Sequence, residues 1–173
     1  MEEVADRCRT AALAFTNGAE TWTKADLAAW LVGPYRAATR SGSMPPPPSS
    51  PSGLHRRSIE PAAVDDMLTD AHVRVVAALE NVAISRDKTV FAQRIAADNT
   101  LIRVTDRQGK AGWIPLAAPR MRLAARVMTL FAADALSRPE IYDSLTVCHR
   151  CERVRFRDMD ADCTCGTRVR GEA

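Results

Sequence analysis

The chain has 173 residues, of which 46% are hydrophobic and 5% aromatic, and a formal net charge of +3. This composition predicts a soluble globular protein built mostly from helices, because alanine, valine and leucine greatly outnumber aromatic residues. The balance of 24 basic against 21 acidic residues excludes nucleic-acid binding driven by net charge alone. No apolar run approaches the ~20 residues that span a bilayer, so we expect no membrane span. The acidic N-terminus, residues 1–6, lacks the basic start of a secretory signal and favours a cytoplasmic location.

An N-terminal helical arm is predicted for residues 1–42, with helices over about 2–16 and 24–39. Thr23 precedes the second helix and can cap its first backbone N–H groups, while Asp26 complements the positive end of the helix dipole. The Gly33-Pro34 pair is expected to end or kink that helix, because proline lacks the N–H group that the helix needs.

A Pro/Ser-rich linker is predicted for residues 43–57, which contain four consecutive prolines. Prolines hold the backbone near polyproline II, and the surrounding serines and glycines bury little surface. The segment is therefore interpreted as a spacer. A proline-rich ligand for an aromatic groove on a partner is the alternative.

The strongest helix pattern covers residues 61–83 and opens a helical domain predicted for residues 58–145. Its apolar residues recur at alternating steps of four and three: Val64, Leu68, Ala71, Val75, Ala78 and Val82. This spacing forms one apolar stripe, which can pack into the domain's own core or form a dimer seam with a second copy.

The rest of this domain is predicted to contain two helices and one β-hairpin. A helix is expected over residues 87–97, capped by Ser85, and a hairpin near residues 100–116, with Gly109 in its turn. Another helix is expected from Pro119 to about residue 137. The predicted fold class is therefore mainly α with a small β-hairpin, followed by a C-terminal zinc-knuckle or zinc-ribbon appendage.

A four-cysteine zinc module is predicted for residues 146–173. Two cysteines are separated by two residues and two by one, and a turn-forming segment lies between the pairs. Four soft thiolates suit tetrahedral Zn²⁺, and thiols in a reducing compartment bind metal more readily than they form disulfides. The predicted ligands of this structural zinc ion are Cys148, Cys151, Cys163 and Cys165.

The segment from about residue 146 to 170 resembles zinc ribbons and zinc knuckles. This resemblance implies a structural metal on the four cysteines, although Thr164 alone separates the second pair, where such modules carry two residues. The runs 112–116, 132–134 and 138–139 also resemble a group of bacterial proteins that end in a cysteine knuckle. That likeness implies no activity.

Other chemistries of four thiols remain as alternatives. They can form a redox switch, disulfides or an iron–sulfur centre, which also uses four thiolates. Catalytic zinc is disfavoured, because four protein ligands leave no position for water.

No enzyme is predicted, because the sequence contains no phosphate-binding glycine loop, no zinc-protease helix and no nucleophile elbow. His72 lies among apolar neighbours and is interpreted as a packing histidine. The expected function is a protein-interaction or regulatory adaptor with another protein as its partner. The alternative is a nucleic-acid-binding regulator, and the third hypothesis is a redox-switched zinc-thiolate chaperone. The nucleic-acid hypothesis uses the arginines around the zinc module: Arg150, Arg153, Arg155, Arg157, Arg168 and Arg170.

Overall fold

The computed structural model describes residues 2–39, 61–105, 108–116 and 121–156, so the predicted linker 43–57 lies outside the described residues. The described part is mainly α-helical with two small antiparallel strand pairs, which confirms the mainly α fold class with a small β-hairpin. Most of the predicted zinc-knuckle appendage lies outside the described residues. In chain order the elements are α1 (Glu2–Gly18), the 3-10 turn η1 (Ala19–Thr21), α2 (Lys24–Trp30), the π-helical turn η2 (Leu31–Tyr35), α3 (Arg36–Thr39), α4 (Pro61–Ile84), α5 (Val90–Ala97), β1 (Leu101–Thr105), β2 (Ala111–Pro115), α6 (Leu123–Ser137), the 3-10 segment η3 (Pro139–Ser144), β3 (Leu145–Val147) and β4 (Val154–Phe156).

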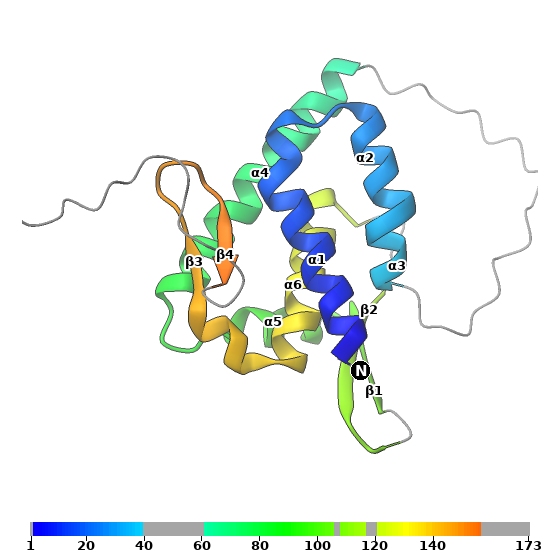
Figure 1. The fold of residues 1–173 in the computed structure, drawn as a ribbon, viewed down its shortest axis with the longest axis vertical. Coiled ribbons are helices and arrows are strands. Elements are labelled where there is room, and N and C mark those ends of the chain that lie inside the picture. Colours follow the sequence, from blue (N-terminus) through cyan, green and yellow to red (C-terminus); the bar gives the residue numbers. More distant parts are fainter. Residues whose placement is uncertain (1, 40–60, 106–107, 117–120, 157–173) are drawn as a thin grey trace, which may run out of the picture.

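Helix α6 forms the centre of the fold. Helices α1, α4 and α5 and strand β2 all pack against it, and Figure 1 shows α1 lying across its front. Every residue of α6 from Thr129 to Ala135 is buried, which is expected of a helix covered on all sides. Small alanines at three of these positions let the neighbouring helices approach closely.

The apolar stripe of α4 faces this core. Five of its six predicted residues are buried, and only Ala78 is partly exposed. The stripe is therefore used inside the chain, and the alternative of a dimer seam through residues 61–83 is wrong for these side chains. Each fully buried aliphatic side chain of this kind stabilises the fold by about 1.5–3 kcal/mol relative to an exposed one.

An aromatic cluster joins α1 to α2. The Phe15, Trp30 and Tyr35 rings follow one another at centroid distances of 5.3 and 5.2 Å, and Trp22 packs edge-on to Phe15. The Trp30 indole N–H donates to the Ala11 carbonyl at 2.8 Å. The residues of the predicted N-terminal arm thus lie in the same core cluster as α4 and α6.

The second N-terminal helix begins as predicted. The Thr23 hydroxyl accepts from the Asp26 N–H, and the Asp26 carboxylate accepts from the Thr23 N–H, which is a complete capping box. At Gly33-Pro34 the chain neither stops nor departs from the helical path. It widens into the π-helical turn η2 and continues as α3, since a wider turn accommodates the missing proline N–H.

Two predicted helix starts differ from the structure. Helix α5 begins at Val90 and not at Asp87, and its N-cap residue is Thr89 and not Ser85. The Asp87 carboxylate instead accepts hydrogen bonds from the Thr89 N–H and hydroxyl, which closes a turn before the helix. Helix α6 begins at Leu123, and the predicted start at Pro119 lies outside the described residues.

The predicted hairpin is the antiparallel pair β1–β2. Arg103 lies opposite Trp113 in its register, and Gly109 in the turn has a φ of 81°, which favours glycine. A second antiparallel pair, β3–β4, places Thr146 opposite Arg155. It lies beside α4, well away from the first hairpin (Figure 1).

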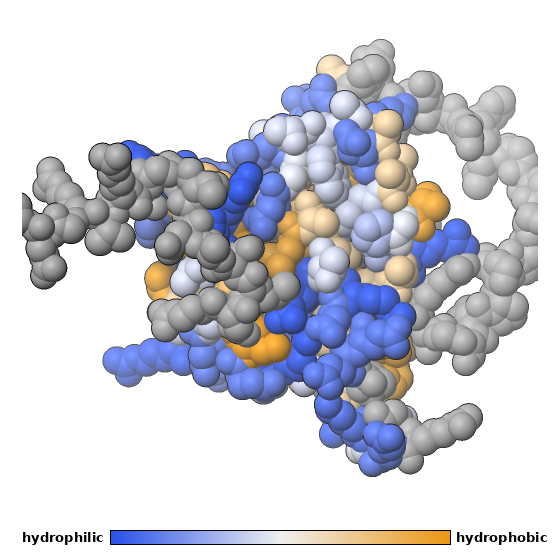
Figure 2. Space-filling view, viewed as in Figure 1, coloured by the Kyte–Doolittle hydropathy of each residue, from blue (hydrophilic) through white to orange (hydrophobic). Residues whose placement is uncertain are grey.

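The outer surface carries no dominant apolar area on the face that Figure 2 shows. Hydrophilic residues cover the hairpin and the lower end of α1, and hydrophobic residues emerge in small separate groups. Among the described residues, no helix has both the length and the apolar character needed to cross a bilayer.

Candidate functional site

The first cysteine pair lies in the turn that joins β3 to β4. The Cys148 N–H donates to the Arg153 carbonyl at 3.0 Å, and the Glu152 N–H donates to the Cys148 carbonyl at 2.8 Å. Glu152 has a φ of 52°, so a left-handed residue closes the turn. Cys148 and Cys151 are half-buried there, whereas Cys163 and Cys165 lie outside the described residues.

The two strands that flank this turn are packed into the core. Leu145, Val154 and Phe156 are each 1% exposed and belong to the main core cluster. The Asn17 side chain, at the end of α1, donates to the Val154 carbonyl at 3.0 Å and accepts from the Val154 N–H at 2.8 Å. The cysteine turn is therefore fixed to the helical body by apolar packing and by a paired hydrogen bond.

A cavity of about 360 Å³ lies between this turn and the helical body. Its lining comes from segments far apart in the sequence. The end of α1, η1 and α4 contribute Thr16, Glu20 and His72, and the turn contributes Cys151, Glu152 and Arg153. Arg150 also lines the cavity.

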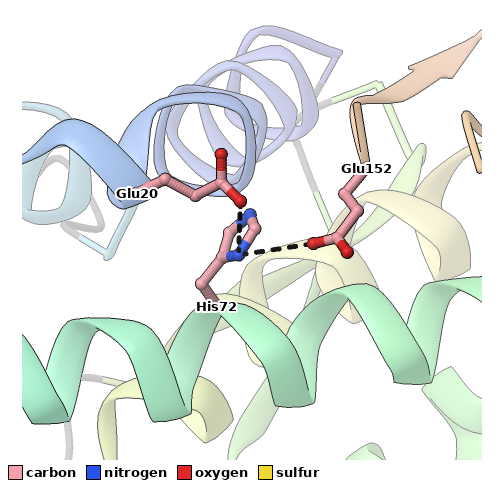
Figure 3. A group of neighbouring side chains, drawn as sticks. All are labelled: Glu20, His72 and Glu152. Atoms are coloured by element: carbon pink, nitrogen blue, oxygen red, sulfur yellow. Dashed lines mark ion pairs between the residues drawn. The ribbon is translucent and has the colours of Figure 1, made fainter. Parts of the chain in front are cut away.

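His72 projects from α4 into this cavity between two glutamates (Figure 3). Its Nδ1 lies 3.7 Å from Oε1 of Glu20 and 3.9 Å from Oε2 of Glu152. The histidine side chain is only 5% exposed, whereas those of Glu20 and Glu152 are 63% and 50% exposed. A buried ring nitrogen thus faces two carboxylates that remain in contact with water.

The other ring nitrogen defines the tautomer of His72. Nε2 lies 2.9 Å from the Thr16 carbonyl oxygen. Because a carbonyl oxygen can only accept, Nε2 must carry the hydrogen and donate it. In the neutral ring Nδ1 then holds a lone pair, and an oxygen of each carboxylate lies within 3.9 Å of this nitrogen. The arrangement can accept either a proton or a metal cation at Nδ1.

A second ionic cluster lies inside the fold, around Asp134 of α6. Arg138 donates to the carboxylates of both Asp134 and Asp6. The Tyr142 hydroxyl donates to the Phe131 carbonyl at 2.8 Å, and Asp134 Oδ2 lies 3.2 Å from it as a further acceptor. This network joins α1, α6 and η3.

Burial and hydrogen bonds shift the pKa values of the three charged groups in this network differently. Burial raises the pKa of Asp134, and the Arg138 hydrogen bonds only partly offset this effect. The Arg138 hydrogen bond lowers the pKa of Asp6, which is nearer the surface. Burial opposes the charge on Arg138, but the hydrogen bonds to Asp134 and Asp6 outweigh it and raise the pKa of the guanidinium. These are the contacts of a structural network.

The fifth cysteine, Cys8, packs within the core next to this network and is 0% exposed. Burial, together with the negative charge of Asp134, raises the pKa of the Cys8 thiol to about 12. A thiol that stays protonated is a poor metal ligand and a poor nucleophile. Cys8 is therefore a packing residue.

The basic residues of the nucleic-acid hypothesis, which also uses the arginines Arg120, Arg122 and Arg126 of the helix predicted from Pro119, do not all face solvent in the same way. Arg150 and Arg153 are exposed on the cysteine turn, and Arg155 on β4 is half-buried. The Arg126 guanidinium of α6 lies over the Tyr35 ring at 5.4 Å. Arg157, Arg168 and Arg170 lie outside the described residues.

Sequence reasoning located the first cysteine pair but missed the cluster around His72. The three members lie far apart in the sequence, and the apolar neighbours of His72 on α4 favoured a packing role. The packing interpretation is correct for one ring nitrogen, because Nε2 donates to the Thr16 carbonyl. The other nitrogen, Nδ1, lies near the Glu20 carboxylate. Only the folded arrangement brings the glutamates to it.

Comparisons with protein-family models, curated proteins and solved structures found no match to this chain.

Proposed function

We propose that this protein is a non-enzymatic protein-interaction or regulatory adaptor with a structural zinc ion at its C-terminal end. The proposed ligands are Cys148, Cys151, Cys163 and Cys165. The site that carries this proposal is the β3–β4 turn, in which two half-buried cysteines lie on a loop closed by backbone hydrogen bonds. Two cysteines on one tight turn can supply half of the ligands of a tetrahedral zinc site.

The anchoring of the turn supports a structural role for the metal. Leu145, Val154 and Phe156 bury their side chains on one side of the turn, and Asn17 holds β4 in place. A zinc ion that links this fixed pair to a second pair would tie the following segment to the helical body. An ordered segment of this kind can present a fixed surface to a partner protein.

Thiolate ligation is tested directly with Co²⁺ in place of zinc. We expect the reduced full chain to bind one Co²⁺ with strong sulfur-to-metal charge-transfer absorption in the near ultraviolet. The double substitution Cys148→Ser/Cys151→Ser should abolish this absorption. Cys8→Ala is the matched control, because it removes a thiol outside the proposed site and should leave the spectrum unchanged. An unchanged spectrum in the double variant would remove the zinc-knuckle proposal.

The adaptor role is tested by partner capture from cell lysate with the zinc-loaded full chain as bait. A specific protein partner should be recovered by the wild-type chain and lost with Cys148→Ser/Cys151→Ser. Turnover of a small molecule by the purified protein, with no partner recovered, would contradict the proposal.

Nucleic-acid binding is the second candidate function, and the exposed arginines Arg150 and Arg153 on the turn favour it. The glutamates Glu20 and Glu152 in the same cavity oppose it, because they repel phosphate groups. If the arginines contact phosphate, affinity for DNA or RNA should fall steeply as salt rises. Absence of salt-sensitive binding would eliminate this candidate.

A further inference from the structure

We propose that Glu20, His72 and Glu152 form a binding site for one divalent transition-metal cation, separate from the cysteine site. The cation would be of the Zn²⁺ class, bound through Nδ1 of His72 and one carboxylate oxygen from each glutamate. This inference does not depend on the proposed zinc knuckle, because none of its three ligands is a cysteine.

The orientation of His72 is the first observation that points to a metal. Its Nε2–H donates to the Thr16 carbonyl at 2.9 Å, so Nδ1 keeps a lone pair, and His72 lines the cavity. Metal-binding histidines commonly donate their other ring N–H to a backbone carbonyl, which fixes the ring and makes the coordinating nitrogen more basic. His72 is 4% exposed, and the hydrogen bond holds its ring in that orientation before any cation arrives.

The nitrogen–oxygen distances are too long for direct hydrogen bonds and slightly longer than the spacing of zinc ligands. Nδ1 lies 3.7 and 3.9 Å from the nearest oxygens of Glu20 and Glu152, which is too long for an N–H···O hydrogen bond. Ligand bonds to zinc of about 2.0–2.2 Å at tetrahedral angles place two ligand atoms about 3.4 Å apart. Each glutamate oxygen must therefore move a few tenths of an ångström closer to Nδ1 when an ion binds.

The two glutamate oxygens must also approach each other when an ion binds. All three ligand atoms lie within 4.8 Å of one another. The two glutamate side chains are at least half exposed, so they can rotate toward a cation without disturbing the core. The rigid member of the site is the buried histidine, and the mobile members are at the rim.

The donor types and charges select the class of cation. One imidazole nitrogen with two carboxylate oxygens suits Zn²⁺, Co²⁺, Ni²⁺ or Mn²⁺, whereas Mg²⁺ and Ca²⁺ prefer oxygen ligands throughout. The two carboxylates bring a formal charge of about −2 to the neutral ring, which a divalent cation would cancel. Arg150 and Arg153 also line the cavity, and their positive charges at its edge work against the cation and reduce this attraction.

A bound cation would connect three parts of the fold. Its ligands come from η1 after α1, from the middle of α4 and from the turn between β3 and β4. The cavity of about 360 Å³ leaves room for water at the remaining coordination positions. The cation would therefore clamp the cysteine turn onto the helical body.

Calorimetric titration of the reduced, metal-free full chain with Zn²⁺ tests the site. We expect Glu20→Gln/Glu152→Gln to lose one equivalent of tightly bound cation, with affinity at this site at least about 100-fold weaker, since even outer partners of metal ligands matter 10- to about 100-fold. The matched control is Asp65→Asn/Asp66→Asn, which removes two exposed carboxylates from α4 and should change the affinity by less than about 3-fold.

The thiol site is separated from this one by a second titration. In Cys148→Ser/Cys151→Ser, Co²⁺ should still bind with weak absorption and without sulfur charge transfer. Adding Glu20→Gln/Glu152→Gln to that background should remove this remaining binding. Loss of charge transfer alone would therefore report on the cysteine site, and loss of the weak bands would report on the His72 site.

Nitrogen NMR of the histidine rings provides a readout that a structural role would not move. On addition of Zn²⁺ the Nδ1 resonance of His72 should shift strongly, while Nε2 keeps its hydrogen. His149→Ala removes the exposed histidine of the cysteine turn and should leave the shifted resonance in place. An Nδ1 resonance unmoved at saturating Zn²⁺, or equal Zn²⁺ affinity in wild type and Glu20→Gln/Glu152→Gln, would show only an ion pair with His72 and overturn the proposal.

Discussion

The two clusters of charged side chains described above both contain two carboxylates and differ in whether these are hydrogen-bonded to the neighbouring basic group. Around Asp134, each carboxylate receives hydrogen bonds from Arg138, and the buried hydroxyl of Tyr142 has acceptors. Around His72, two carboxylates face one ring nitrogen at 3.7 and 3.9 Å without a hydrogen bond to it. Arg138 and Tyr142 thus satisfy the carboxylate of Asp134 in the first cluster. In the second, Nδ1 of His72 lies near carboxylates without a hydrogen bond to them, and the proposed cation site rests on this difference.

The largest effect is expected from breaking the cluster around Asp134. Asp134→Ala leaves the guanidinium of Arg138, whose side chain is 11% exposed, without its buried partner. Loss of one member of a buried pair typically costs about 3–5 kcal/mol of unfolding free energy. Urea denaturation measures this loss. Asp70→Ala is the control, because its ion pair with Arg74 is exposed and should contribute less than about 0.5 kcal/mol. A cost for Asp134→Ala no larger than that of the control would contradict the structural role.

Thiol reactivity should separate Cys8, beside the cluster around Asp134, from the cysteines beside the cluster around His72. With its pKa raised to about 12, Cys8 holds about a thousandfold less thiolate at neutral pH than an ordinary cysteine. In the metal-free native chain we expect Cys148 and Cys151, which are only half-buried, to be alkylated faster than Cys8, as measured by peptide mass spectrometry. In urea all cysteines should react alike. Rapid native alkylation of Cys8 would show that the core around Asp134 opens readily.

A pH titration sharpens the description of the cluster around Asp134. The Arg138 hydrogen bond lowers the pKa of Asp6 below 3.8, so the native state favours the charged carboxylate. The resulting stability is present above the unfolded pKa and is lost as pH falls through the folded one. Asp6 is half exposed, so solvent screening limits the effect to about 0.5 kcal/mol. Asp6→Asn should therefore be less stable than wild type at neutral pH, and the two urea midpoints should converge in acid. Parallel midpoints at every pH would refute this assignment.

The smallest effect is expected from the cluster around His72 when no metal is present. Glu20→Gln/Glu152→Gln removes two exposed carboxylates that make no hydrogen bond to His72, so the unfolding free energy should change by less than about 0.5 kcal/mol in chelator. Added Zn²⁺ should then stabilise the wild type more than this variant. A large loss in chelator would mean that the glutamates are structural ion-pair partners, and the contrast between the clusters would fail.

Local patterns in the sequence predicted much of the fold. The stripe of α4, the capping box of Thr23 and Asp26 and the turn glycine Gly109 each depend on residues a few positions apart. The start of α5 was missed because Asp87 forms its own turn with Thr89 and delays the helix. The π-helical turn at Pro34 depends on how the helix accommodates a proline, which spacing does not specify.

The candidate sites also show that local patterns can be predicted from the sequence, whereas contacts between distant residues cannot. The pair Cys148 and Cys151 is recognisable as a candidate because the spacing expected of metal-binding cysteines is a local property. Glu20, His72 and Glu152 meet only because Asn17 and the core fix the β3–β4 turn near α4. The spacing of these three residues in the sequence does not indicate that they lie close together, and only the folded structure shows it.

Asn17 has one more consequence, for how copies of this protein behave toward one another. A two-stranded sheet exposes the backbone groups of its outer strands, and such groups can recruit a strand from a neighbouring molecule. At Val154 both of these groups are already taken by the Asn17 amide, which imitates the donor and acceptor of an adjacent strand. The side chain of a helix thus occupies both backbone groups of Val154, so an added strand could not pair with the sheet at this position.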